Sequence, residues 1–190
     1  YLSMPNWCQN VIYVSHEDEN KMAALKDAVI NGEMCAHIKP MPDALKGITS
    51  GATTIDGETH RLWRNDEDGK AIAIPQAELD QMVADHGTAS WYDWCCDNWG
   101  TKWDICQPWD SDEIYDADDG KGTYVFKFDT AWSPPIPVYD AMIEQGFHLV
   151  ARYVEYGCGY HGEYSKDGDY YHNKIEDGDE IDEHLQSEYA

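Results

Sequence analysis

The stretch YVFKFDTAWSPPIPVYDAMIEQGFHLVARY, from Tyr124 to Tyr153, decides the fold of this chain. Aromatic side chains occupy every second position over residues 124–129, the period of a half-buried strand. A Ser-Pro-Pro turn at 133–135 leads into a helix predicted over 137–145, with proline early and glycine directly after its end. Large side chains alternate again over 147–153. The stretch therefore predicts a strand, a helix and a second strand.

The residues before this stretch predict the other half of the same unit. A short strand around 11–13 is followed by a helix that runs to Asn31, with Asp18 or Ser15 as its N-cap. A further strand is predicted over 101–107. Strand, helix, strand, strand, helix and strand is the split β-α-β order. The predicted fold class is therefore α+β, a ferredoxin-like plait with helices on one face of an antiparallel sheet.

Two additions to the plait are predicted. A C-terminal hairpin has strands that end near Tyr164 and begin near Tyr170. An insertion at about 47–100 holds two short strands and two helices, one of them opened by Pro75. The predicted organisation is a single domain over 4–172 followed by an acidic tail over 173–190.

Charge constrains the partners of this chain more than its fold does. Its 190 residues include 37 Asp and Glu against 13 Lys and Arg, so the formal net charge is −24. Direct binding of nucleic acid or of an anionic membrane is disfavoured, and a cationic partner is attracted over a long range. No apolar run approaches the length of a membrane span. We therefore expect no direct nucleic acid or membrane partner.

The density of charge decides whether the chain can imitate a polyanion. Spread evenly over a folded surface, −24 gives about one net charge per 380 Å². Duplex DNA carries about one charge per 110 Å² of its enclosing cylinder. The acids must therefore be concentrated if they are to imitate a phosphate backbone.

Two runs of the sequence concentrate acids in this way. Neither 104–119 nor the chain from Glu176 onward contains a Lys or Arg, and each holds seven acids. We predict a partner-binding acidic surface made of Asp110, Asp112, Glu113, Asp116, Asp118, Asp119, Glu176, Asp177, Asp179, Glu180, Asp182 and Glu183. The alternative is that both runs are solvated segments that aid solubility.

No metal or cofactor site is predicted. The six cysteines include no C-x-x-C pair, and the eight histidines do not stand at ligand spacing. The acidic segments 116–120 and 177–179 lack the register of an EF-hand. Buried thiols in a reducing compartment are a simpler account of these cysteines than a disulfide framework, so we expect a cytoplasmic protein of a bacterial host cell.

Three motifs have both a structural and a functional interpretation. The segment 98–103 predicts a helix stop at Gly100 rather than a binding loop. The segment 130–135 predicts a strand-to-helix junction capped by Ser133. Glu155 is a candidate general base, with a hydrogen-bonded or ion-paired edge residue as the alternative.

Several motifs together resemble one family. They are MPNWCQN at 4–10, PMP at 40–42, NWGTKW at 98–103, FDTAWSPP at 128–135 and EYG at 155–157. In this order they resemble the YubB-type ferredoxin-like family of phage and plasmid proteins, from residue 4 to about 165. The resemblance implies the plait fold and an origin on a mobile element. It implies no catalytic residues.

The leading functional hypothesis follows from charge and resemblance together. It is an acidic accessory protein that binds and inhibits a host nucleic-acid-handling (defence) protein with a basic surface, by nucleic-acid mimicry. The first alternative is a small enzyme with a carboxylate or histidine in a Trp-lined cleft. The second is an adaptor without an inhibitory role.

Overall fold

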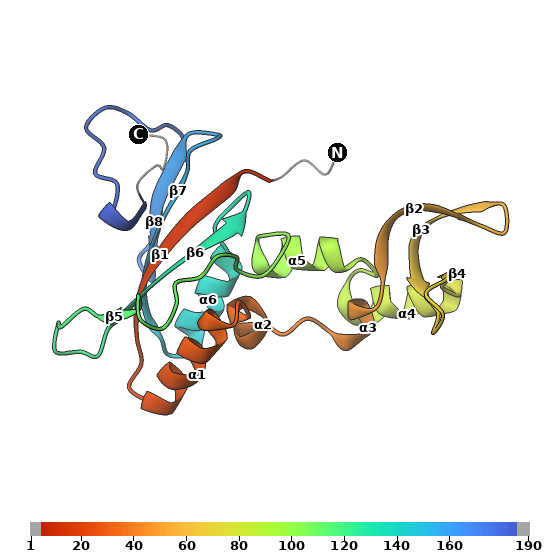
Figure 1. The fold of residues 1–190 in the computed structure, drawn as a ribbon, viewed down its shortest axis with the longest axis horizontal. Coiled ribbons are helices and arrows are strands. Elements are labelled where there is room, and N and C mark those ends of the chain that lie inside the picture. Colours follow the sequence, from red (N-terminus) through yellow and green to blue (C-terminus); the bar gives the residue numbers. More distant parts are fainter. Residues whose placement is uncertain (1–4, 186–190) are drawn as a thin grey trace. The chain divides into compact units, whose positions relative to one another are not determined.

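The chain forms two compact units in a computed structural model that describes residues 5–185 (Figure 1). One unit contains the chain up to Lys39 and again from Trp99, and the other contains Pro40–Asn98. The sequence suggests an insertion at about 47–100, whereas the compact unit already begins at Pro40. No helix among the described residues is both long enough and apolar enough to span a bilayer.

The first unit is built on a six-stranded antiparallel sheet. It contains β1 (Trp7–Ser15), α1 (Glu19–Ile30), α2 (Met34–Ile38), β5 (Tyr115–Asp116), β6 (Tyr124–Ala131), α6 (Ile136–Glu144), β7 (His148–Glu155), β8 (Tyr160–Ser165), β9 (Gly168–His172) and the 3-10 helix η1 (Glu183–Leu185). The strand order is β5-β6-β1-β7-β8-β9. Its first four strands have the connections of the split β-α-β plait, and β8 and β9 extend the sheet beyond β7. The predicted α+β class is confirmed.

Helices cover one face of this sheet and form the main core with it (Figure 1). Strand pairing places Ile12 between Phe126 and Ala151, and all three side chains are buried on the helix side. The hydroxyl of Tyr139 on α6 donates to Oδ1 of Asn10 on β1 at 2.9 Å, with both side chains buried. This bond satisfies polar groups that would otherwise destabilise the core.

Of the two predicted helix caps, the one on α1 forms and the one on α6 does not. Asp18 caps α1, and its side chain accepts a hydrogen bond from the amide of Asn20 at 2.9 Å. Ser133 does not cap α6, because its hydroxyl donates to the carbonyl oxygen of Gly100 at 2.6 Å. Pro135 is the N-cap residue instead, and its side chain makes no capping bond. The prediction for Ser133 was therefore wrong.

The strand predicted over 101–107 does not form. Within it only Cys106 pairs with β6, through an isolated bridge to Asp129. Gln107 then has φ +47°, and Pro108 has no amide hydrogen to donate, so regular pairing stops. The second strand of the plait is instead the two-residue β5, which pairs with β6 at Tyr115.

The second unit has its own small sheet. It contains α3 (Asp43–Lys46), β2 (Thr49–Ile55), β3 (Glu58–Asn65), β4 (Ala71–Ala73), α4 (Gln76–His86) and α5 (Trp91–Trp99), the last of which ends in the first unit. Helix α4 ends at Gly87, whose φ of +79° suits glycine. Met82 is the buried residue of this helix.

Candidate protein-binding site

The C-terminal segment 173–185 folds back onto the sheet face opposite the helices (Figure 1). Leu185 is buried against Val11, Val125 and Val154 of three neighbouring strands. Ile175 and Ile181 pack against the same cluster, which we call the second core. The part of the predicted acidic tail that the structure describes is therefore docked. Residues 186–190 lie outside the described residues.

Asp182 holds this segment to the sheet. Its Oδ2 accepts hydrogen bonds from the Tyr13 hydroxyl at 2.7 Å and from the Arg152 guanidinium at 2.9 Å. Burial disfavours the ionised form, but these bonds and one from the amide of His184 outweigh it and hold the pKa of Asp182 below its ordinary value. The side chain is only 3% exposed. Asp182 was predicted as part of the binding surface, but its carboxylate is already occupied.

The first acidic run meets the docked segment on the same face. Trp109 and Ala117 pack against the second core. The hydroxyl of Tyr115 and Nε2 of His184 are 2.8 Å apart, and the ring of Trp109 meets the His184 ring edge-on at 5.1 Å. Two acidic runs that are distant in sequence therefore lie side by side over one face of the sheet.

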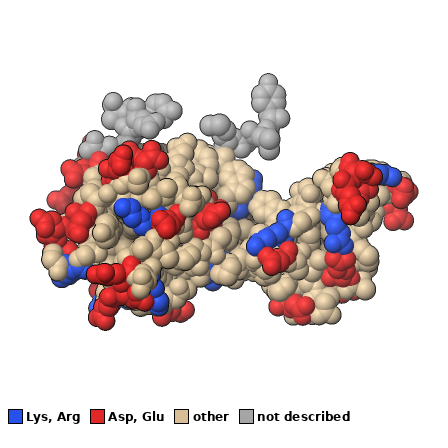
Figure 2. Space-filling model, turned by 60° about the horizontal axis from the view of Figure 1, so that its bottom comes forward, with Lys and Arg blue, Asp and Glu red and all other residues tan. Residues whose placement is uncertain are grey.

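Most of the predicted acids point into solvent from this face. Ten are exposed: Asp110, Asp112, Glu113, Asp116, Asp118, Asp119, Glu176, Asp177, Glu180 and Glu183. Asp179 is partly exposed and contacts Nε2 of His161 at 2.9 Å. We call these eleven residues the acidic face. Figure 2 shows Asp and Glu gathered in several clusters on the side of the molecule in view, with patches of Lys and Arg beside some of them.

Neutralisation by neighbouring cations is slight. Of the twelve predicted acids, Asp182 alone forms an ion pair with Lys or Arg in the part of the chain that the structure describes. The ion-pair contacts of Asp179 and Glu183 are with histidines, and Asp179 also accepts a hydrogen bond from the amide of Glu176 at 2.8 Å. An external cation would therefore break no ion pair with Lys or Arg among the described residues when it binds the acidic face.

Several of these carboxylates also fix the backbone of their own loops. Glu113 accepts a hydrogen bond from the amide of Asp110 at 2.8 Å, and Asp116 accepts one from Asp118 at 2.8 Å. Asp119 accepts from the Thr123 hydroxyl at 2.6 Å, which with the amide of Lys121 lowers the pKa of Asp119. These local hydrogen bonds of the carboxylates give the loop a defined conformation.

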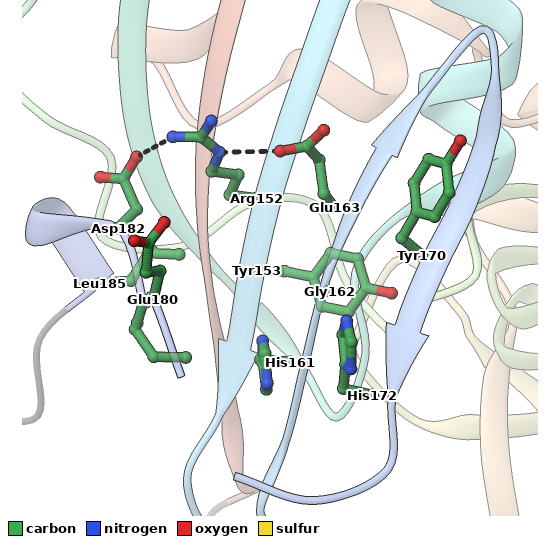
Figure 3. Close-up of a pocket in the computed structure, with 11 residues that line it drawn as sticks. Arg152, Tyr153, His161, Gly162, Glu163, Tyr170, His172, Glu180, Asp182 and Leu185 are labelled. Atoms are coloured by element: carbon green, nitrogen blue, oxygen red, sulfur yellow. Dashed lines mark hydrogen bonds and ion pairs between the residues drawn. The ribbon is translucent and has the colours of Figure 1, made fainter. Parts of the chain in front are cut away.

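A polar hollow of about 280 Å³ lies between the β8–β9 hairpin and the docked segment (Figure 3). Arg152 stands at one side and bridges Asp182 and Glu163, the latter at 3.0 Å. The rings of His161 and His172 stack with their centroids 4.7 Å apart. Sequence reasoning missed this hollow, although His161, Glu163 and Ser165 alternate along the first strand of the predicted hairpin and indicated a polar face. No three His, Cys, Asp or Glu side chains between residues 5 and 185 are placed to share a metal ion.

Glu155 is buried, and its carboxylate stabilises the local backbone. Its two carboxylate oxygens accept hydrogen bonds from the amides of Gly157 and Cys158, at 2.5 and 2.8 Å. Arg152, three positions earlier on β7, makes its ion pairs with Glu163 and Asp182. The hydrogen-bonded interpretation of Glu155 is therefore confirmed, and these bonds hold the turn between β7 and β8.

Among residues 5–185, Asp104 is the carboxyl group whose pKa is clearly raised, and burial is the main cause. Its oxygens accept hydrogen bonds from the amides of Cys35 and Ala36 at 2.8 and 2.9 Å, at the start of α2. The group therefore caps a helix, and its lone pairs are used there. Gly100, with φ +72°, ends α5 as the sequence predicts.

A match to a family model agrees with this fold. Residues 109–189 match the family model described as a ferredoxin-like domain in Api92-like protein. The match and the sheet topology define the first unit as a ferredoxin-like α+β fold. The matched range contains every residue of the acidic face.

One similar solved structure is the crystal structure of a protein api92 from Yersinia pseudotuberculosis. The two sequences are 12% identical, the TM-score is 0.44, and the similarity covers 93% of this chain and 100% of that chain. The comparison with curated proteins gave no match.

Proposed function

We propose that this chain is a non-enzymatic binding protein whose acidic face engages the basic surface of a nucleic-acid-handling protein and blocks it. The observation that carries the proposal is the meeting of two acidic runs over one sheet face, through Trp109, Tyr115 and His184. Because the two runs meet, the negative charge is more concentrated there than it would be if the net charge of −24 were spread evenly over the surface.

The state of the carboxylates supports the same function. Because the acidic face contains almost no paired charge, a cationic partner need not displace internal ion pairs to bind it. Charge of one sign also speeds the encounter with a basic surface and rejects acidic competitors. Binding of this kind weakens steeply with salt, because exposed charges are screened.

The origin of the protein is part of the proposal. The motifs from residue 4 to about 165 resemble the YubB-type family, which is carried by phages and plasmids. An inhibitor of a host defence protein is the role that fits an acidic protein of such an element. The assignment to host defence is an analogy from the family resemblance and the charge. The chemistry of the acidic face itself specifies that the partner has a basic surface.

Two charge-neutralised variants test the role of the acidic face. One carries Asp110→Asn, Asp112→Asn and Glu113→Gln. Its matched control carries Asp66→Asn, Glu67→Gln and Asp68→Asn, which remove the same charge from the β3–β4 turn. Exposed ion pairs contribute about 0.2–1 kcal/mol each, so three losses predict roughly a three- to hundredfold weaker affinity.

The measurement has two parts. Fluorescence anisotropy with an oligolysine peptide gives the affinity at graded salt for the unaltered chain and both variants. Capture from a host lysate then shows whether a nucleic-acid-binding protein is retained and whether duplex DNA displaces it. If both variants bound oligolysine equally weakly, the effect would come from net charge and not from the acidic face. A retained partner that DNA does not displace would contradict mimicry.

A further inference from the structure

An aromatic groove of about 480 Å³ lies where the start of α6 faces the β8–β9 hairpin. Trp132, Pro134 and Pro137 line it from one side, and Tyr160 and Tyr171 line it from the hairpin. The Tyr160 and Tyr171 rings have centroids 5.6 Å apart and planes inclined by 47°. The lining contains one carboxylate, Asp169, and no Lys, Arg or His.

Trp132 lies in the groove wall and has an unfavourable backbone conformation. Its φ of +72° is rare for a bulky residue and costs about 1–2 kcal/mol. Its amide donates to the carbonyl oxygen of Asn6 at 2.9 Å, and its own carbonyl accepts the Tyr160 hydroxyl. The indole nevertheless stays 48% exposed. Strain that presents a large aromatic side chain to solvent points to a binding role.

Asp169 is also held in place. The hydroxyl of the buried Tyr153 donates to its Oδ1 at 2.6 Å. Tyr153 reaches Asp169 across β8 at Gly162, where an added Cβ would lie 2.3 Å from the Tyr153 hydroxyl oxygen. Glycine at position 162 therefore leaves room for the Tyr153 side chain to reach and hold the Asp169 carboxylate. The remaining oxygen, Oδ2, has no hydrogen-bond partner among the described residues.

We propose that this groove binds an arginine side chain presented by the basic partner. The inference rests on the proposed function and names the residue type that the partner inserts. Aromatic faces attract a cation, and a guanidinium can stack on a ring while its edge donates to a carboxylate. The −24 charge of the chain favours a cationic occupant over a neutral proline-rich peptide, which aromatic grooves also accept.

A single-charge probe separates the groove from the long-range field of the acidic face. N-acetyl-arginine amide is titrated into the full chain, and binding is followed by the indole N–H resonance of Trp132. Trp132→Phe assigns that resonance. N-acetyl-citrulline amide has nearly the same shape without the charge, and N-acetyl-lysine amide has the charge without the planar group. We expect the arginine probe to bind most tightly, and equal binding of citrulline would overturn the inference.

Two neighbouring residues of β9 provide matched variants. Tyr171 lines the groove and is 55% exposed, whereas Tyr170 is 57% exposed and lines the hollow on the other side of the sheet. Tyr171→Ala removes one cation–π partner, so the dissociation constant should rise about fivefold. Tyr170→Ala should leave it unchanged. Equal effects of the two substitutions would overturn the inference.

Asp169→Asn is the conservative variant. It keeps the acceptor for Tyr153 but removes the charge, so it should weaken the arginine probe without unfolding the hairpin. The triple substitution at 110–113 tests the proposed function separately. If it abolishes oligolysine binding while Tyr171→Ala leaves the arginine probe unaffected, the acidic face stands and the groove inference fails. The opposite pattern would leave the groove intact and remove the proposed function.

Discussion

Trp132 has a conformation that its side chain disfavours, and its two neighbours in the hydrogen-bond network maintain it. Asn6 accepts its amide and Tyr160 donates to its carbonyl, so the peptide groups on both sides are fixed. A positive φ costs a side-chain-bearing residue about 1–2 kcal/mol, and glycine does not bear that cost. The strain can therefore be measured by comparing two truncations.

We predict that Trp132→Gly is more stable than Trp132→Ala by about 1 kcal/mol. Both substitutions remove the half-exposed indole, but only glycine relieves the positive φ. At a position with ordinary φ the order is the reverse, because glycine lowers stability relative to alanine. Urea unfolding of the two variants, monitored by circular dichroism, gives the difference. An alanine variant as stable as the glycine variant would show that the site is unstrained.

Adjacent acids in the C-terminal segment show what composition cannot reveal. In the sequence Asp182 and Glu183 are two members of one acidic run. In the structure the Asp182 side chain is 3% exposed and bound to Tyr13 and Arg152, whereas the Glu183 side chain is 82% exposed. The difference depends on partners far away in the chain, so the acidic character of the site could be predicted and the role of Asp182 could not.

The docked segment 173–185 should respond to acid. The pKa of Asp182 is lowered as described above, and the pKa of Asp179 is lowered by the amide of Glu176 and by His161. A carboxylate with a lowered pKa in the folded state stabilises that state fully above its unfolded pKa, and the stabilisation is lost as the pH falls through the folded pKa. We therefore expect the segment to undock as the pH falls below about 4, the ordinary pKa of an aspartate.

Hydrogen exchange of the Leu185 amide, which donates to the carbonyl oxygen of Asp182 at 2.9 Å, reports this undocking. Rates corrected for the intrinsic effect of pH should increase as the segment undocks, before those of β1 do. Asp182→Asn is the control, since it cannot titrate and should flatten the profile. An unchanged acid transition in that variant would assign the effect to other groups.

The elements that periodicity defines were predictable, and those defined by distant contacts were not. Strands β6 and β7 and helix α6 appear in the sequence as clear alternation and proline–glycine boundaries. Strand β2 contains Gly51 and small polar residues, so its sequence has no apolar period. The second core is equally hidden, because Ile175, Ile181 and Leu185 follow neither a helical nor a strand repeat.

The charge of the chain acts through its arrangement as well as through its total. The acidic face exists because Leu185 and Trp109 fix two acidic runs on one sheet face. If this geometry matters, a substitution that undocks the segment should weaken binding of cations even though it changes no charge. If only the total matters, such a substitution should have no effect.

Leu185→Ala makes this distinction. Truncation of a buried leucine costs about 2–5 kcal/mol. The segment is also held by the Asp182 bonds, by the Tyr115–His184 and His161–Asp179 contacts and by the Tyr156 hydroxyl, which donates to the Leu185 carbonyl oxygen, and we expect loss of the Leu185 side chain to release it. Leu45→Ala is the matched control, because Leu45 is equally buried in the unit formed by Pro40–Asn98 and the net charge is again unchanged. Oligolysine affinity should fall in the first variant and persist in the second, with a shallower salt dependence where the two runs have separated. Equal affinities would mean that the acidic runs act independently, and the docked arrangement would then have no part in recognition.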